Sequence, residues 1–320
     1  MKKIIALLLT LILAVGVLVS CNQPDDTETT TIKIGVMNGP TGMGMAKLIN
    51  DNGKESEKYV FSSFSSPTDA TASLQNGELD MLCVPTNLAA NLAKANSEFI
   101  SVAAVNCLGS LYVVTDGSVE LNSLSDLAGK TVYCGEPTST TPSILNYLFD
   151  LYNIDVDLQI ESTNEVVSAN MTAGSVSIAV LPEPKATAAI LSAKQSGYNY
   201  SIALNISEEW SEKSDSPLTM GCIIVKKSFI AENKASVDAF LAEYKTSIEY
   251  IADPANHDAS AQMIVDAGIL PKLPVANSAL TNLYGSIVYI DGAEMKTALE
   301  GFYTAIGYAL PADSFYYGNE

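Results

Sequence analysis

Residues 32–49, with the sequence IKIGVMNGPTGMGMAKLI, decide the fold that we expect for this chain. Residues 32–37 alternate in polarity and are rich in β-branched side chains, which predicts a strand. Residues 43–49 have a helical pattern, and the glycines and proline before them predict a tight turn. A strand, a glycine-rich turn and a helix in this order bring backbone N–H groups to the carboxyl edge of a sheet, where open α/β sheets bind ligands.

The same module occurs again 97 positions further along the chain. Residues 130–134 predict its strand, residues 135–142 its turn and residues 143–152 its helix. A second pair of segments keeps the offset, because 76–85 (NGELDMLCVP) matches 173–182 (AGSVSIAVLP). In each of these segments a glycine ends a helix and a proline ends an apolar strand. Two modules at one offset predict two similar α/β lobes, each with its own sheet.

The order of the expected elements also predicts how the chain divides between the lobes. Strands that alternate with helices indicate parallel pairing with right-handed crossovers. Residues 218–226 (LTMGCIIVK) predict a strand that returns to the first lobe, followed by helical patterns over 228–253, with a break at Asn233 and Lys234, and over 259–267 and 291–306. We therefore expect a discontinuous first lobe of residues 32–115 plus 219–320 and a second lobe of residues 116–218, with the crossings near 115–118 and 215–220.

The N-terminus has the pattern of an export signal. Lys2 and Lys3 precede an apolar run over residues 4–19, which ends in Leu-Val-Ser-Cys at Cys21. This ending resembles the bacterial lipobox, which implies cleavage after residue 20 and lipid, such as palmitate, on Cys21; the alternative is an uncleaved anchor helix. Residues 21–31 are polar and acidic and predict a flexible tether. We expect the mature chain at the extracytoplasmic face of the bacterial cell membrane.

The composition limits the partners that the protein can have. A chain of 320 residues is longer than is usual for a single hydrophobic core and long enough to form two. It has no arginine, and its 17 lysines face 36 acidic residues, for a net charge of −19; loss of residues 1–20, with two lysines and no acid, takes this to −21. This acidity excludes nucleic acid and anionic lipid head groups as natural partners, since both need a basic face.

Few groups are suited to catalysis or to metal binding. The single histidine, His257, lies in a polar loop and cannot by itself form a zinc site or serve a conventional catalytic triad. We therefore expect no enzyme activity, no metal and no cofactor. The cysteines after Cys21 lie in or beside apolar runs, so we expect buried thiols, although an exported location permits a disulfide.

Candidate binding residues follow the predicted strands. In the first turn, the N–H groups after Pro40 could cradle a ligand, or the turn could simply connect strand and helix. The hydroxyl run after residue 137 can donate and accept without charge, whereas helix capping would use only one of its members. Glu183 could pair with an amine or amidinium on a ligand, or be a surface carboxylate. The full set is Gly39, Pro40, Thr41, Gly42, Met43, Thr86, Asn87, Thr138, Ser139, Thr140, Thr141 and Glu183.

Taken in order, these motifs resemble a known family. The lipobox, the GPTGMG turn, NGELD, SLSDLAGKTVY at 123–133 and GSVSIAVLPEP at 174–184 resemble the type 2 solute-binding proteins of ABC importers, in the nitrate/sulfonate/taurine and thiamine-precursor class. The resemblance covers residues 31–320. It implies a two-lobed type 2 periplasmic-binding-protein fold with two Rossmann-like sheets joined by a hinge. It also implies a monomer that closes on a small-molecule solute and delivers it to an ABC permease and ATPase complex.

The lack of arginine departs from what this family needs to clamp a sulfonate or carboxylate through paired hydrogen bonds. We therefore expect a small neutral or weakly basic organic solute, such as a heteroaromatic ring, with sulfonate or nitrate as the alternative. Two other functions stay open at this point. One is a lipoprotein that senses a solute without transport. The other is an enzyme on the same fold, although the pyrimidine-forming relatives use histidines and a cysteine cluster that this chain lacks.

Overall fold

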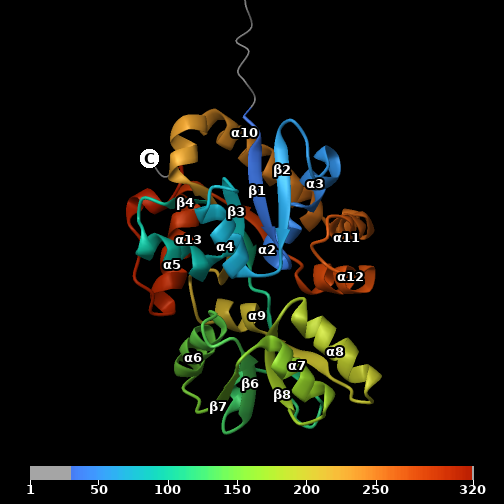
Figure 1. The fold of residues 1–320 in the computed structure, drawn as a ribbon. Helices are drawn as coiled ribbons and strands as arrows, with labels where there is room; N and C mark the ends of the chain where they lie inside the picture. The colour runs from blue at the N-terminus through green and yellow to red at the C-terminus, as the bar shows by residue number, and fades with distance from the viewer. Residues whose placement is uncertain (1–29, 319–320) are drawn as a thin grey trace, which may run out of the picture.

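The protein has two α/β lobes, which are described over residues 30–318 of a computed structural model (Figure 1). The strands of the first sheet are β1 (Ile32–Met37), β2 (Tyr59–Phe64), β3 (Met81–Pro85), β4 (Ile100–Leu108), β10 (Thr219–Lys226) and β11 (Ile287–Ile290). Those of the second are β5 (Leu111–Thr115), β6 (Thr131–Gly135), β7 (Asp157–Glu161), β8 (Ile178–Pro182) and β9 (Ser201–Asn205). The orders are β11-β4-β10-β3-β1-β2 and β7-β6-β8-β5-β9. This confirms the expected two-lobed architecture.

Helices cover both sheets, with the first lobe above the second in Figure 1. The first lobe carries α2 (Pro40–Met43), α3 (Ala46–Asn52), α4 (Pro67–Gln75), α5 (Thr86–Ala95), α10 (Lys227–Ala252), α11 (His257–Asp266), α12 (Leu273–Asn282) and α13 (Gly292–Ala305). The second carries α6 (Thr141–Tyr152), α7 (Asn164–Thr172), α8 (Lys185–Gln195) and α9 (Ile206–Ser211). Among the residues described, no helix combines the length and the apolar character needed to cross a bilayer.

The repeat predicted from the sequence is present in the structure. The parallel strands β2-β1-β3 of the first sheet correspond to β7-β6-β8 of the second. The strands β3 and β8 begin and end 97 positions apart, and so do the helices α4 and α7. Gly77 and Gly174 follow these helices with φ values of 80° and 70°, a conformation that glycine adopts without a steric penalty. The local sequence signals were therefore sufficient to predict the strands and helices in this half of each lobe.

The predicted first crossing between the lobes was wrong. Leu111–Thr115 belongs to the second sheet, where it pairs antiparallel with β8 and β9. The crossing is at Gly109 and Ser110, whose φ values of 63° and 83° turn the chain out of β4. Because β5 is buried along its whole length, its sequence fits either sheet and gives no sign of which one it joins. The return lies between α9 and β10, and we propose lobe limits of 32–109 plus 219–318 and 110–218 accordingly.

The C-terminal third contains more than the helices that we predicted. It adds α12 and the four-residue edge strand β11, which pairs with β4. A strand this short has too few residues to show a period. The break predicted in the long helix is present, since Asn233 has a non-helical φ of −132° within α10.

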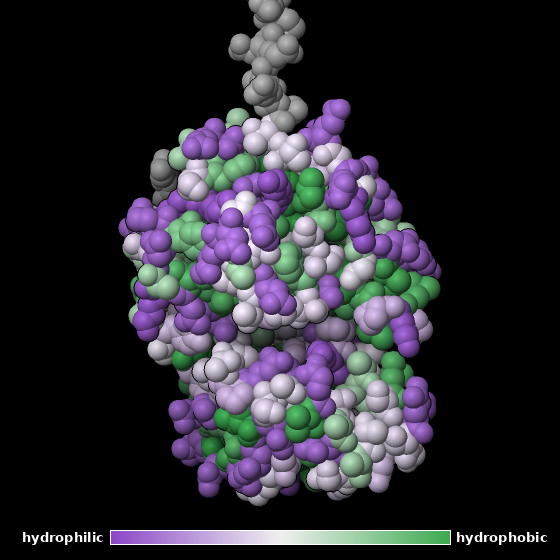
Figure 2. All heavy atoms as spheres, in the orientation of Figure 1, coloured by the Kyte–Doolittle hydropathy of each residue, from purple (hydrophilic) through white to green (hydrophobic). Residues whose placement is uncertain are grey.

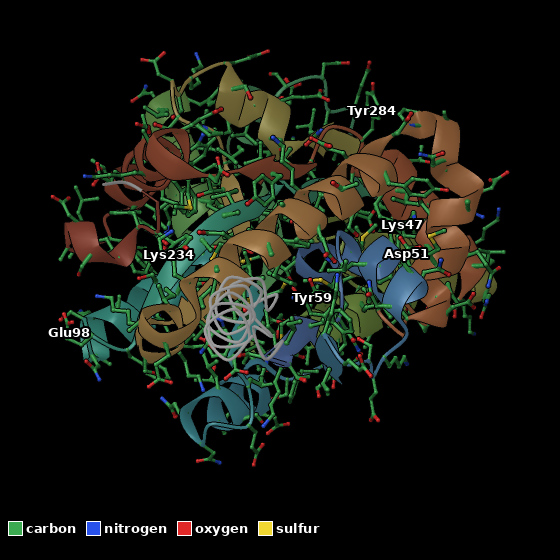
Figure 3. The ribbon with its side chains drawn as sticks, turned by 90° about the horizontal axis from the view of Figure 1, so that it is seen from above. Lys47, Asp51, Tyr59, Glu98, Lys234 and Tyr284 are labelled. Carbon is green, nitrogen blue, oxygen red and sulfur yellow. The ribbon has the colours of Figure 1, made fainter. Side chains whose placement is uncertain are left out.

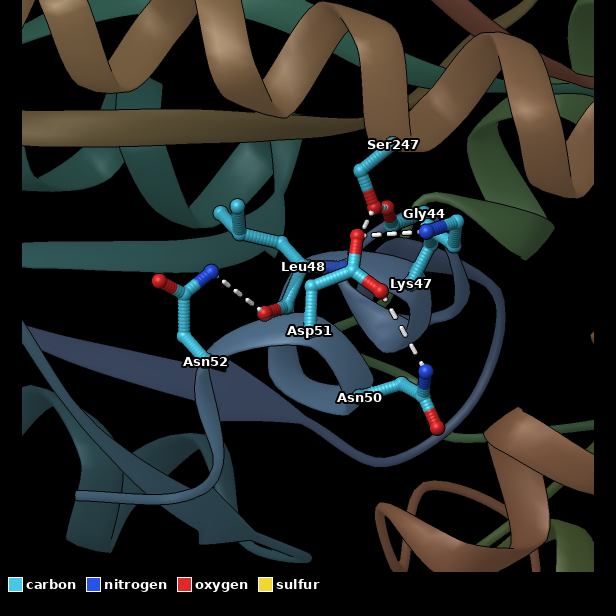
Figure 4. A network of polar contacts seen from close by, with 7 residues as sticks. All are labelled: Gly44, Lys47, Leu48, Asn50, Asp51, Asn52 and Ser247. Carbon is cyan, nitrogen blue, oxygen red and sulfur yellow. Dashed lines mark hydrogen bonds and ion pairs between the residues drawn. The ribbon is translucent and has the colours of Figure 1, made fainter. Parts of the chain in front are cut away.

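The helix predicted over residues 43–49 begins at Ala46 as α3, and the short helix α2 occupies the predicted turn. The break between α2 and α3 has a packing cause (Figure 4). A Cβ on Gly44 would lie 2.5 Å from Ile248 of α10, so this glycine permits a close approach. Ser247 of α10 accepts a hydrogen bond from the N–H of Leu48 at 3.0 Å and donates one to the carbonyl of Gly44 at 2.6 Å. The N-cap residue of α3, Met45, makes no side-chain cap bond. Ser247 therefore caps α3 from another helix.

An apolar contact joins the lobes on one side. Trp210 of α9 is fully buried. The centroid of its ring lies 5.0 Å from the ring centroid of Tyr147 in α6 and 5.8 Å from that of Phe302 in α13. Its indole N–H donates to the carbonyl of Ser216 at 2.6 Å, in the segment that returns to the first lobe. Because α13 packs on the first sheet and α6 and α9 pack on the second, the Trp210 ring contacts the hydrophobic cores of both lobes.

Candidate functional site

A cavity of about 680 Å³ lies where the carboxyl ends of strands from both sheets meet. Its first-lobe wall comes from the turns after β1 and β3, together with Met220 of β10. Its second-lobe wall comes from the turns after β6, β7 and β8. Figure 2 shows a furrow between the lobes on this face. The cavity is therefore at the edge where α/β sheets bind ligands.

In the turn after β1, the structure brings Gly39, Pro40 and Thr41 to the cavity but not Gly42 or Met43. Gly42 and Met43 are buried behind the wall, and a Cβ on Gly42 would lie 2.1 Å from a backbone oxygen. The N–H of Gly42 already donates to the carbonyl of Gly39 at 3.0 Å. The amide of Asn106, itself 1% exposed, donates to the carbonyl of Thr41 at 3.0 Å and holds this turn from behind.

In the turn after β3, Asn87 lines the cavity and Thr86 does not. Thr86 is 1% exposed, and its hydroxyl donates to the carbonyl of Thr219 at 2.9 Å. This bond links the start of α5 to β10, so the hydroxyl proton of Thr86 is not available to a solute. No side chain caps α5, so its first-turn N–H groups beside the cavity lack a side-chain partner.

The hydroxyl run of the second lobe lines the cavity as a group, over Thr138, Ser139, Thr140 and Thr141. Thr140 is the N-cap residue of α6 but makes no side-chain cap bond. The hydroxyl of Ser139 accepts from the N–H of Thr141 at 3.3 Å, so one member of the run supports the helix start. The others remain available as neutral donors and acceptors.

Glu183 lines the cavity and is 2% exposed, so it is not a surface carboxylate. Its carboxylate accepts from the hydroxyl of Thr187 at 2.8 Å and from the side-chain amide of Asn282 at 2.5 Å. It also accepts from the N–H of Thr187 at 3.4 Å, in the first turn of α8. Because Asn282 ends α12 in the first lobe, Glu183 forms a polar contact between the lobes, opposite the apolar contact at Trp210.

Among the polar or charged lining residues that are not in the set selected from the sequence are Glu136, Asn164 and Lys185. Glu136 has a φ of 61°, which is uncommon for a residue other than glycine, and its carboxylate accepts from the amide of Asn164 at 2.8 Å. Lys185 pairs with Glu165. All three directly follow strands or begin helices, so the rule that selected Asn87 and Glu183 would have found them.

The lining differs from that expected for a heteroaromatic solute. Among the described residues that line the cavity there is no aromatic side chain on which a ring could stack. Its apolar part comes from Met37, Leu88, Cys107 and Met220, together with prolines. Burial raises the pKa of the Cys107 thiol to about 12, so this sulfur is a neutral part of the wall. The described cysteines are all free and buried, as the sequence predicted.

Two sheets with a cavity at their facing strand ends have the architecture of the two-lobed type 2 periplasmic-binding-protein fold. The chain belongs to the NMT1-like family, whose model matches residues 25–265. A search of curated protein sequences gives no match.

Solved structures with the same fold include an ABC transporter protein and two periplasmic binding proteins. An ABC transporter protein from Parabacteroides distasonis is 20% identical, with a TM-score of 0.72 over 91% of this chain and 100% of the other. The periplasmic aliphatic sulphonate-binding protein SsuA from Escherichia coli is 17% identical, with a TM-score of 0.66 over 89% and 90%. The periplasmic nitrate-binding protein NrtA from Synechocystis PCC 6803 is 14% identical, with a TM-score of 0.54 over 76% and 67%. At these identities the likeness shows the fold.

Proposed function

We propose that the protein is an extracytoplasmic, lipid-anchored receptor that captures a small organic solute between its lobes and delivers it to the permease of an ABC importer. The observation that carries the proposal is the cavity, whose walls are strand ends and helix starts of both lobes. The named structural relatives, a sulphonate-binding and a nitrate-binding protein, agree with a role in solute binding rather than catalysis.

The mechanism is closure of the lobes around the solute. The chain passes twice between the sheets, at Gly109–Ser110 and after α9. These two connecting segments can act as a hinge about which one lobe rotates relative to the other. A solute that touches both walls binds the closed arrangement more tightly and selects it. Micromolar affinity corresponds to about −8 kcal/mol, which a few hydrogen bonds in a cavity of this size can supply.

Native mass spectrometry of the freshly purified protein, without dialysis, tests solute capture independently of the solute's identity. We expect a small molecule to co-purify, and we expect Asn87→Ala and Thr138→Ala, one from each wall, to lose it. Thr246→Ala, on the exposed face of α10, is the matched control and should retain it. If the wild-type protein carries no solute, and small-angle scattering shows no compaction in the presence of a cell extract, the receptor proposal fails.

Delivery to an importer predicts that cells without the gene lose uptake of the solute that co-purifies. The lipid anchor is tested separately through Cys21, which lies outside the described residues. Cys21→Ala should abolish palmitate labelling and move the protein from the membrane to the soluble fraction. Unchanged membrane association of this variant would instead support an uncleaved anchor at residues 1–20.

A further inference from the structure

The charges that line the cavity bear on the kind of solute that it can hold. The lining contains two carboxylates, Glu136 and Glu183, and a single lysine, Lys185. Lys185 is already paired with Glu165, and the chain contains no arginine that could supply another cation. Among the described residues, neither Glu136 nor Glu183 has a lysine within ion-pair distance. Both carboxylates therefore lack a cationic partner within residues 30–318.

Glu183 provides the stronger of the two observations. A carboxylate that is 2% exposed has lost nearly all of its water, and neutral donors from Thr187 and Asn282 only partly replace it. Buried carboxylates are usually matched by a positive charge. Because Glu183 lines the cavity, the side left open to such a charge is the side of the solute.

Glu136 reinforces this conclusion from the turn after β6. Its left-handed φ of 61° is unfavourable for a side chain with a Cβ, and backbone strain of this kind is concentrated at ligand sites. Asn164, which is 6% exposed, donates to one carboxylate oxygen and fixes the group at the cavity wall. The second carboxylate oxygen is left to accept from a solute.

We propose that the solute carries a protonated nitrogen with N–H groups, an ammonium or an amidinium, which donates to Glu136 and Glu183. This inference rests on the proposed function and names the solute class for the same cavity. A quaternary ammonium fits less well, because it has no N–H to donate and the described lining has no aromatic ring to receive it. The N-cap residues of α5 and α6 make no side-chain cap bond, so free N–H groups in these first turns can hold an acceptor oxygen elsewhere on the same solute. In the part of the lining that the structure describes, a free oxyanion would meet two carboxylates and no unpaired cation.

Thermal-shift and calorimetric titrations with matched probes test the proposal. β-Alaninamide and propanamide share a skeleton and differ in the ammonium group, and agmatine supplies a guanidinium. Ethanesulfonate and nitrate are the anionic probes, and choline is the cation without N–H. We expect β-alaninamide or agmatine at millimolar concentration to raise the melting temperature, with no comparable effect from propanamide, choline or either anion.

Two variants assign the effect to the cavity. Glu136→Gln should weaken binding of the amine probe about tenfold or more, since it removes one charge-assisted hydrogen bond. Glu98→Gln makes the same charge change at an exposed position on the outer edge of the first lobe (Figure 3) and should leave binding unchanged. Glu183→Gln should also weaken binding, and its melting temperature without probe shows whether lost stability contributes.

The outcomes separate the solute class from the receptor function. Binding of ethanesulfonate or nitrate in preference to the amines overturns the solute class and leaves the receptor proposal standing. Amine binding that is unaffected by both Glu136→Gln and Glu183→Gln places the probe outside the cavity and also overturns it. If neither amine probe binds, the solute class is rejected, while the co-purifying solute still decides whether the protein is a receptor.

Discussion

Ser247→Ala tests whether a residue far along the chain holds the helix beside the cavity. The substitution removes one oxygen that is 2% exposed and makes two hydrogen bonds, from the N–H of Leu48 and to the carbonyl of Gly44. Both backbone groups lie against α10, as Figure 4 shows. An alanine at position 247 has no polar side-chain atom with which either group could form a hydrogen bond. The variant keeps the helix propensity of α10, because alanine favours helix.

The expected loss of stability follows from those two bonds. Each contributes about 1 kcal/mol net, and removal of a helix cap costs about 0.5–2 kcal/mol, so we expect about 2 kcal/mol in total. For a chain of this size, that corresponds to a decrease in melting temperature of about 3–5 °C. Solute affinity should fall as well, since α2 and α3 follow directly from the cavity wall at Gly39–Thr41.

Urea unfolding and calorimetry measure the effect, with Thr246→Ala as the matched control. Thr246 directly precedes Ser247 in α10, but its hydroxyl is exposed and bonds only to the carbonyl of Ala242 in its own helix. Its removal should change the free energy of unfolding by less than about 0.5 kcal/mol. If Ser247→Ala costs no more than Thr246→Ala, Ser247 does not cap α3 and the account of the divided helix is wrong.

Three further predictions follow. Gly42→Ala should lower the free energy of unfolding by more than about 2 kcal/mol and reduce the folded yield, because its Cβ would meet the carbonyl oxygen of Met37 at 2.1 Å; normal folding and binding would contradict this close approach. Burial raises the thiol pKa values of Cys83 and Cys107 from 9.0 to about 12. The contribution of these thiols to the free energy of unfolding is therefore fully present below pH 9 and is lost between pH 9 and 12. The free energy of unfolding should fall there by up to about 1.4 kcal/mol per pH unit for each thiol. Urea unfolding at pH values below and above 9 measures this change in the free energy of unfolding. Serine at both positions should make the free energy of unfolding less dependent on pH in this range. Asn282→Ala should cost about 1–3 kcal/mol in urea unfolding, because it removes a donor from the buried carboxylate that precedes α8; a neutral result would mean that this contact between the lobes adds no stability.

The sequence determined those parts of the protein in which neighbouring residues fix the conformation. The strands β1 and β6, the repeat at an offset of 97 and the glycines that end α4 and α7 all depend on side-chain period or on backbone freedom. The same signals selected nine of the residues that line the cavity, because strand ends in two similar lobes are predicted without knowledge of their packing.

The tertiary structure decided what depends on partners distant in sequence. Leu111–Thr115 is apolar on both faces, so only its pairing with β8 and β9 places it in the second lobe. Thr86 and Asn87 are adjacent in one turn, yet a bond to Thr219 withdraws the first from the cavity and leaves the second in it. Ser247 acts on a residue 199 positions away. Contacts of this kind leave no local period in the sequence, since they arise only when both lobes have packed.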